Sequence, residues 1–210
     1  MSPEKPGLSI VAVLSAMRPA QWTKNAVVLA AFFFAYWDRN QPHHLDLLSG
    51  LKLALPAAIL FCIVSSGIYI LNDIKDLLSD RNHPVKKNRP VASGAISVPS
   101  AWLISSILLV FGCAGSWLLS KPFGAVVLGY IAMQLLYSYW LKKVPLVDII
   151  VISAGFVIRA VAGALVMNVI ISPWLLLCTF FLALFLALCK RRHEKVVLAD
   201  APQTRPGIEL

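Results

Sequence analysis

Charged residues are scarce in this chain. Asp, Glu, Lys and Arg make up 14% of its 210 residues, whereas 59% are hydrophobic and the mean hydropathy is +0.76. The apolar residues come in long blocks and not as a stripe that repeats about every 3.6 residues. This distribution excludes a soluble domain and predicts helices that span a membrane.

Several familiar functional signatures are also missing. The sequence contains no Ser-His-Asp arrangement, Walker loop or dinucleotide-binding fingerprint. Its four cysteines lie inside apolar blocks, without a CxxC or a metal-like spacing, at Cys62, Cys113, Cys178 and Cys189. We therefore interpret the cysteines as packing residues.

Six apolar blocks organise the chain. We predict an all-α membrane bundle with six spans, at residues 26–37, 51–71, 101–119, 123–141, 146–169 and 172–188. The first block is only about two-thirds of a bilayer thickness, so the first span must begin nearer Pro19 or tilt into a protein-lined cavity. No repeat or soluble segment interrupts the blocks, and we expect residues 1–210 to form one transmembrane domain.

Acidic residues are outnumbered, because 10 Asp and Glu stand against 19 Lys and Arg, for a net charge of +9. The basic residues gather in a few loops between apolar blocks, which argues against nucleic acid as a partner. The lipid bilayer is the expected surroundings. By the positive-inside rule, the N-terminus and the most polar loops are predicted to be cytoplasmic.

The most informative stretch runs from Asn72 to Gly94, directly after the second block. If the helix continues, Asp73, Asp76 and Asp80 fall at i, i+3 and i+7 and share one face, which Asn72 borders. Mg²⁺ prefers hard oxygen ligands and typically takes one or two carboxylates together with phosphate oxygens and water. We therefore predict a Mg²⁺ site at Asp73, Asp76 and Asp80.

Basic side chains follow these carboxylates closely. Arg81, Lys86 and Arg89 lie within the same stretch. Such groups suit the phosphate oxygens of a ligand that carries Mg²⁺, and arginine offers them a bidentate fork. The whole stretch predicts a socket for a magnesium diphosphate at a membrane surface.

A second polar site lies between the fourth and fifth blocks. Tyr137, Lys142 and Lys143 end one predicted helix, and Asp148 begins the next. The two lysines fit either a phosphate contact or side chains that snorkel to the interface. Asp148 fits either a metal or substrate role, or an acid favoured by the positive end of a helix dipole.

Further basic residues leave similar alternatives open. An unpaired arginine as deep as Arg159 costs about 2.5 kcal/mol or more, so it must face a carboxylate of the protein or an anion in a water-filled site. Lys24 is either a positive-inside anchor or a phosphate contact. The basic run Lys190 to Arg192 is either a cytoplasmic anchor or a phosphate or head-group contact.

These residues resemble known motifs. The stretch NDIKDLLSD at 72–80 is similar to the NDxxDxxxD signature of the UbiA-type intramembrane prenyltransferase superfamily. YSYWLK at 137–142, with Asp148, resembles that superfamily's second motif. Four more stretches are similar to its decaprenyl-phosphate phosphoribosyltransferase branch, at residues 18–25, 80–94, 158–163 and 190–194.

The resemblance implies a transferase that moves 5-phosphoribose from 5-phosphoribosyl 1-diphosphate to a polyprenyl phosphate in a bacterial inner (plasma) membrane. The implied product is polyprenylphosphoryl-5-phosphoribose, a precursor of lipid-linked arabinose donors for the cell envelope. The resemblance also implies nine spans around a cytoplasm-facing cavity. Because the sequence supplies six, we expect a chain that is incomplete at its C-terminal end. A homo-oligomer is a further expectation.

The resemblance also implies roles for individual residues. Asp73, Asp76 and Asp148 would be the catalytic carboxylates, acting with Mg²⁺. Substrate binding is implied for Lys24, Asn72, Arg81, Lys86, Arg89, Tyr137, Lys142 and Arg159. Two alternatives stay open: an aromatic or quinone-type polyprenyltransferase that uses a polyprenyl diphosphate, and an inactive fragment of either enzyme. A membrane carrier is disfavoured, because no inverted repeat is visible.

Overall fold

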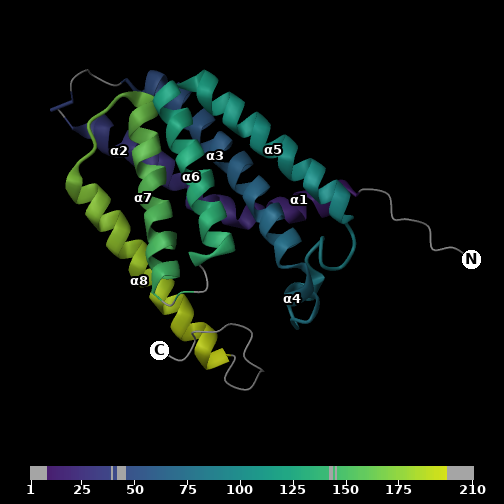
Figure 1. Ribbon diagram of the computed structural model, residues 1–210. Helices are drawn as coiled ribbons and strands as arrows, with labels where there is room; N and C mark the ends of the chain where they lie inside the picture. The colour runs from purple at the N-terminus through teal and green to yellow at the C-terminus, as the bar shows by residue number, and fades with distance from the viewer. Residues whose placement is uncertain (1–8, 39, 42–45, 142–143, 145, 198–210) are drawn as a thin grey trace, which may run out of the picture.

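The structure, a computed structural model, describes residues 9–38, 40–41, 46–141, 144 and 146–197. Every secondary-structure element in these ranges is a helix, which confirms the predicted all-α class. Five of the described helices are long and apolar enough to cross a membrane: α3 (Leu47–Lys75), α5 (Val98–Leu119), α6 (Lys121–Tyr139), α7 (Val147–Met167) and α8 (Pro173–Val197). Figure 1 shows them as a bundle, with α8 along one side and α5 on the other.

Helix α3 is the central element of this bundle. Its 29 residues extend for about 44 Å, more than the roughly 30 Å of a bilayer's hydrocarbon core. The helix begins after Asp46, whose side chain caps it by accepting the backbone N–H of Ser49. It packs closely on α5, where a Cβ added to Gly112 would lie 2.5 Å from the Val64 side chain. Helix α3 thereby carries the Asp-rich stretch to one end of the bundle.

The first predicted span is built from two pieces. The 3-10 helix η1 (Pro19–Leu29) continues directly into helix α2 (Ala30–Trp37). At roughly 2.0 Å per residue for a 3-10 helix and 1.5 Å for an α-helix, the two reach about 34 Å. The segment therefore starts at Pro19, as its length required. Among the described residues, five of the six predicted spans are single long helices, and the first is this two-part segment.

Short helices shape the polar end of the bundle. Helix α1 (Ile10–Met17) is followed by Arg18, whose left-handed backbone (φ 54°) turns the chain into η1. Helix α4 (Leu77–Arg81) and the 3-10 turn η2 (Lys86–Asn88) fold the Asp-rich stretch back beside the end of α3 (Figure 1). These elements place the carboxylates and the first basic groups next to one another.

Aromatic residues fill the centre of the core, while other large apolar side chains face outward. Phe61 of α3 has its ring centroid 5.9 Å from that of Phe123 and 5.3 Å from that of Tyr130 on α6. On α8, Phe181 and Phe185 are exposed. An exposed apolar surface matches lipid tails, which are as apolar as the side chains themselves. Polar chemistry is therefore concentrated inside the bundle and at its ends.

Candidate active site

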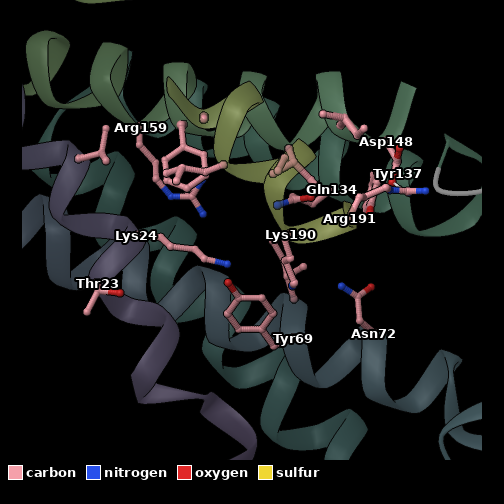
Figure 2. A pocket seen from close by; sticks show the side chains of 18 residues that line it. Thr23, Lys24, Tyr69, Asn72, Gln134, Tyr137, Asp148, Arg159, Lys190 and Arg191 are labelled. Carbon is pink, nitrogen blue, oxygen red and sulfur yellow. Dashed lines mark hydrogen bonds and ion pairs between the residues drawn. The ribbon is translucent and has the colours of Figure 1, made fainter. Parts of the chain in front are cut away.

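A cavity of about 520 Å³ lies among η1, α3, α6, α7 and α8. Figure 2 shows the polar side chains that line it. Five of them were expected at a substrate site: Lys24, Asn72, Tyr137, Asp148 and Arg159. Residues that lie far apart in the sequence therefore meet around one space.

Helix periodicity explains this lining. On α7, Asp148, Ile152 and Arg159 fall on one stripe and all face the cavity. On α8, residues 183, 186, 187, 190 and 191 follow the i, i+3, i+4, i+7, i+8 pattern of a single helix face. That pattern is a signal from which Lys190 and Arg191 could have been assigned to the site. Thr23, Tyr69 and Gln134 also line it, without a comparable signal in the sequence.

Asp73 lies beside the cavity and not in its lining. Consecutive helix residues point about 100° apart, so Asn72 faces the cavity while Asp73 turns away from it. Asp73 is 1% exposed and accepts hydrogen bonds from Arg18 and, at 3.2 Å, from Arg89. Arg89 also donates to the buried Asp80 at 2.6 Å. Two buried carboxylates of the predicted metal site are thus held by arginines.

The three carboxylates do not share one continuous helix face. Helix α3 ends at Lys75, and Asp76 adopts a turn conformation (φ −89°, ψ 9°) before α4 begins. The expectation of a shared face assumed an unbroken helix, and the break at Asp76 corrects it. Within the ranges that the structure describes, no three His, Cys, Asp or Glu side chains gather closely enough to hold a metal by themselves.

The basic loop lies outside the cavity as well. Arg81 is exposed and donates from Nε to the Ala92 carbonyl oxygen at 3.2 Å. Lys86 is partly buried, and neither residue lines the cavity. Lys142 and Lys143 lie outside the described residues. The expected substrate-binding set is therefore divided between the cavity and the loop beside it.

Asp148 links two walls of the cavity. It is 2% exposed and accepts a hydrogen bond from Arg191, which ties the start of α7 to the end of α8. Its Oδ1 atom is buried without a partner among the described residues, and so is Oδ2 of Asp73. A buried carboxylate oxygen without a partner is costly, so a ligand or cation that reached either oxygen would be stabilised.

Arg159 is held without a carboxylate. It is 4% exposed and donates to Asn25 Oδ1 at 2.8 Å, to the Gly155 carbonyl at 2.7 Å and to the Tyr130 hydroxyl at 2.7 Å. Its guanidinium carbon lies 4.8 Å from the Tyr130 ring centroid and 5.6 Å from that of Phe156. Among the described residues no ion pair neutralises it. Of the two partners expected for Arg159, a protein carboxylate is not found.

Comparison with known proteins decides the family. Residues 26–194 match the UbiA prenyltransferase family. The chain belongs to this family. A UbiA homologue from Archaeoglobus fulgidus, solved with DMAPP and Mg²⁺, shares its fold, with a TM-score of 0.73 and 21% identity over 92% of this chain and 67% of that one. The resemblance drawn from the motifs is confirmed.

Two curated relatives within the UbiA family carry a more specific name. This chain is 35% identical to decaprenyl-phosphate phosphoribosyltransferase of Mycobacterium tuberculosis, over 91% of this chain and 62% of that protein. It is 38% identical to the enzyme of the same name from Corynebacterium glutamicum, over 87% of this chain and 54% of that protein. The chain thus spans little more than half the length of these relatives.

The family and the five apolar helices together make this an integral, multi-pass membrane protein. Its residues also fit the Mg²⁺ expected in such a UbiA site. Mg²⁺ needs only one or two protein carboxylates when a diphosphate supplies further oxygens. Asp73 and Asp148 each keep one buried oxygen that accepts no hydrogen bond from a described residue. Each of these oxygens therefore fits a Mg²⁺ ion whose other ligands come from water and a bound phosphate group.

Proposed function

We propose that this UbiA family member forms the substrate site of a Mg²⁺-dependent phosphoribosyltransferase. The donor is 5-phosphoribosyl 1-diphosphate, the acceptor is a polyprenyl phosphate such as decaprenyl phosphate, and the product is polyprenylphosphoryl-5-phosphoribose for cell-envelope arabinose donors. The names of the mycobacterial and corynebacterial relatives support this choice. The positive-inside rule favours a cytoplasmic cavity in a bacterial inner membrane.

One observation carries the proposal. The cavity combines a carboxylate, Asp148, with several cationic groups: Lys24, Arg159, Lys190 and Arg191. A donor with both a diphosphate and a 5-phosphate carries more negative charge than a polyprenyl diphosphate does. The number of cations in the cavity therefore favours the phosphoribosyl donor over the prenyl diphosphate of an aromatic prenyltransferase.

The reaction is a displacement at ribose C1. A phosphate oxygen of the polyprenyl phosphate forms a bond to C1, and the bond from C1 to the diphosphate oxygen breaks with its electron pair on the diphosphate. The attacking oxygen is already ionised, so no side chain has to act as a general base. The task left to the protein is to hold both anions in line for the displacement and to stabilise the departing charge.

We assign the residues accordingly. Mg²⁺ bound with the diphosphate supplies positive charge against the charge that grows on the leaving group. Asp73, Asp76 and Asp148, with Asp80 as a further ligand, are proposed to hold this metal. Phosphate oxygens are proposed to contact Asn72, Arg81, Lys86, Arg89, Tyr137 and Lys142. Lys24 and Arg159 bind substrate from the opposite side of the cavity.

The proposal is tested with labelled 5-phosphoribosyl 1-diphosphate, a polyprenyl phosphate and Mg²⁺ in nanodiscs. The chain is assayed both alone and joined to the remaining part of the Corynebacterium glutamicum relative. We expect label to move into lipid, and Asp73→Asn to reduce its rate by about 100-fold or more, since electrostatic stabilisation of the leaving group is lost. Asp46→Asn, at the opposite end of α3, is the matched control.

The outcomes separate the alternatives. Transfer that needs Mg²⁺ and Asp73 but not Asp46 supports the proposal. Transfer seen only in the joined protein supports the same chemistry and identifies the isolated chain as an inactive fragment. The proposal fails if no form moves label into lipid while a polyprenyl diphosphate and an aromatic acceptor react.

A further inference from the structure

Two neutral polar side chains, Gln134 and Tyr69, line the cavity beside the charged residues. Gln134 belongs to α6 and Tyr69 to α3. Figure 2 shows the Tyr69 ring on one side of the cavity and Gln134 on the other. Neither side chain brings a charge that would attract phosphate. Their hydrogen-bonding groups therefore suit a neutral, polar part of a ligand.

Packing between α3 and α6 places these two residues at a similar depth in the bundle. The Phe61 ring of α3 contacts both Phe123 and Tyr130 of α6, and the two helices run in the same direction (Figure 1). Tyr69 follows Phe61 by about two helical turns. Gln134 follows the midpoint of Phe123 and Tyr130 by about two turns as well. The amide and the phenol therefore approach the same level of the cavity from two walls.

This level lies between two groups of residues that are proposed to bind anions. Asn72 and Tyr137, which are assigned to phosphate oxygens, each come three residues, about one turn, after Tyr69 and Gln134. Arg159 donates to a hydroxyl of α6 that lies about one turn before Gln134. Gln134 and Tyr69 are thus placed for the part of a substrate that connects two anionic groups.

Both side chains are held in place and keep hydrogen-bonding groups for the cavity. Gln134 donates from Nε2 to the Tyr130 hydroxyl at 2.9 Å, and no described residue donates to its Oε1. The guanidinium carbon of Arg18 lies 5.3 Å from the centroid of the Tyr69 ring, and no described residue hydrogen-bonds to the Tyr69 hydroxyl. A carboxamide and a phenol each offer both a donor and an acceptor. A sugar hydroxyl, which also donates and accepts, matches them.

We infer that Gln134 and Tyr69 are specificity-determining residues that bind the ribose hydroxyls of the donor. The inference rests on the proposed function, because the donor of that reaction carries a sugar between two anionic groups. A diphosphate is common to a ribosyl and a prenyl donor, so cations that bind it, such as Lys190, do not distinguish the two. An isoprenoid chain would leave the amide and the phenol without partners, and a site built to bind a hydroxyl rejects an analogue that lacks it.

The test compares phosphates that differ in their hydroxyls, titrated in EDTA into the full chain in detergent micelles. Ribose 5-phosphate carries the sugar hydroxyls, whereas tetrahydrofurfuryl phosphate keeps the ring and the phosphate without them. We expect the wild type to prefer ribose 5-phosphate about tenfold, as for two hydrogen bonds between neutral groups. Gln134→Leu and Tyr69→Phe should each lower this preference about threefold. Tyr139→Phe changes an exposed tyrosine outside the cavity lining and should leave it unchanged.

The ratio of the two dissociation constants is the readout, because a general disturbance of the cavity weakens both probes alike. Gln134→Asn keeps the amide and is expected to keep part of the preference. 2-Deoxyribose 5-phosphate, with one hydroxyl fewer, should bind the wild type with intermediate affinity. The inference is overturned if the wild type binds neither phosphate, if it binds both equally well, or if Gln134→Leu and Tyr69→Phe keep the wild-type preference.

This experiment fails separately from the assay of transfer. If label never reaches lipid while a preference for ribose 5-phosphate depends on Gln134 and Tyr69, phosphoribosyl transfer is wrong and the hydroxyl-binding site stands. If transfer occurs but both variants keep the preference, the proposed transfer stands and the ribose hydroxyls are bound by other residues.

Discussion

Buried charged side chains have different partners in two regions of the protein, one on each side of Asn72. On one side, Asp73 and Asp80 are neutralised by Arg18 and Arg89. On the other side, across the cavity, Arg159 is held by neutral groups among the residues that the structure describes. An ion pair neutralises both of its members, whereas a cation held by neutral acceptors remains able to bind an anion. The first region keeps only Oδ2 of Asp73 for the proposed metal, whereas the second keeps the whole charge of Arg159 for an anion.

Removing an arginine from the first region should have the largest effect. Arg89→Gln leaves Asp80 without an ion-pair partner among the described residues and Asp73 with one fewer. Because a buried carboxylate that loses its partner is strongly destabilising, we expect a loss of about 3 kcal/mol in the free energy of unfolding. The measurement is unfolding in mixed detergent micelles. Lys87→Gln, an exposed lysine of the same loop, is the control.

A double-mutant cycle sharpens this result. If the penalty comes from the unpaired charge, Asp80→Asn in the Arg89→Gln background should restore part of the stability, because the charge itself is removed. Strictly additive losses would show that the two residues contribute independently. In that case the comparison between a paired and an unpaired region no longer holds.

The region around Arg159 depends on a close contact between α7 and the backbone of η1. A Cβ on Gly163 of α7 would lie 2.0 Å from the Val28 carbonyl oxygen of η1. Gly163→Ala must therefore push η1 away from α7, and we expect a loss of about 1 to 3 kcal/mol, as for overpacking. The matched control is Gly129→Ala on α6, where an added Cβ meets nothing within 4 Å. A neutral Gly163→Ala would contradict the packing described here.

The same substitution tests whether the contact serves the cavity. Lys24 lies on η1 and Arg159 on α7, so separating the two elements moves apart two residues that are proposed to bind substrate. We expect Gly163→Ala to weaken ribose 5-phosphate binding, while Gly129→Ala leaves it unchanged. Normal binding in a folded Gly163→Ala protein would show that this contact is not needed for substrate binding.

A smaller loss of stability is expected when one of the neutral hydrogen-bond acceptors of Arg159 is removed. Tyr130→Phe removes the hydroxyl that accepts from Arg159 at 2.7 Å and from Gln134 at 2.9 Å. Gln134 lines the cavity and can turn to water, so we expect a loss of about 1 kcal/mol. Phosphate binding should weaken through the altered position of Arg159. Thermal unfolding measures the loss of stability, and titration with ribose 5-phosphate measures the loss of binding. Phe123→Tyr, a change of similar size in the same core, is the control that shows whether any core substitution has these effects.

The sequence predicted what depends on composition. Long apolar blocks located α3, α5, α6, α7 and α8, because such blocks are stable only in lipid or in a membrane protein's core. Asp148 and Arg159 were found because ionisable groups are costly inside a span and therefore need a partner or a cavity. Both lie in the lining of the same cavity.

What depends on contacts between distant residues was not predictable. Arg18 and Asp73 are 55 positions apart, and their pairing follows from the way α1 and η1 cross the end of α3. The helix break at Asp76 was not predicted either, because the spacing of the three Asp residues is compatible with a continuous helix. A single such break changes which carboxylates share a face, and this is why the metal site was the least well predicted part.

The smallest effect on stability is expected at the opposite end of α3. The carboxylate there is exposed and caps a helix, unlike the buried carboxylates near Asn72. Asp46 is in solvent, and its oxygens accept from the Ser49 backbone N–H at 2.6 Å and from the Ser49 hydroxyl at 2.8 Å. These hydrogen bonds, the backbone one foremost, lower the pKa of Asp46 below its ordinary value of 3.8. Its stabilisation is therefore fully present above about pH 3.8 and is lost as the pH falls through the lower folded-state pKa.

Asp46→Asn should accordingly destabilise the protein slightly at neutral pH, and the difference from the wild type should shrink in acid below pH 3.8. The unfolding midpoints of both proteins between pH 7 and pH 3 measure this. A difference that stays constant down to the lowest pH would show that the cap acts without its charge. Asp46 would then resemble the neutral partners of Arg159 more than the charged partners of Arg89.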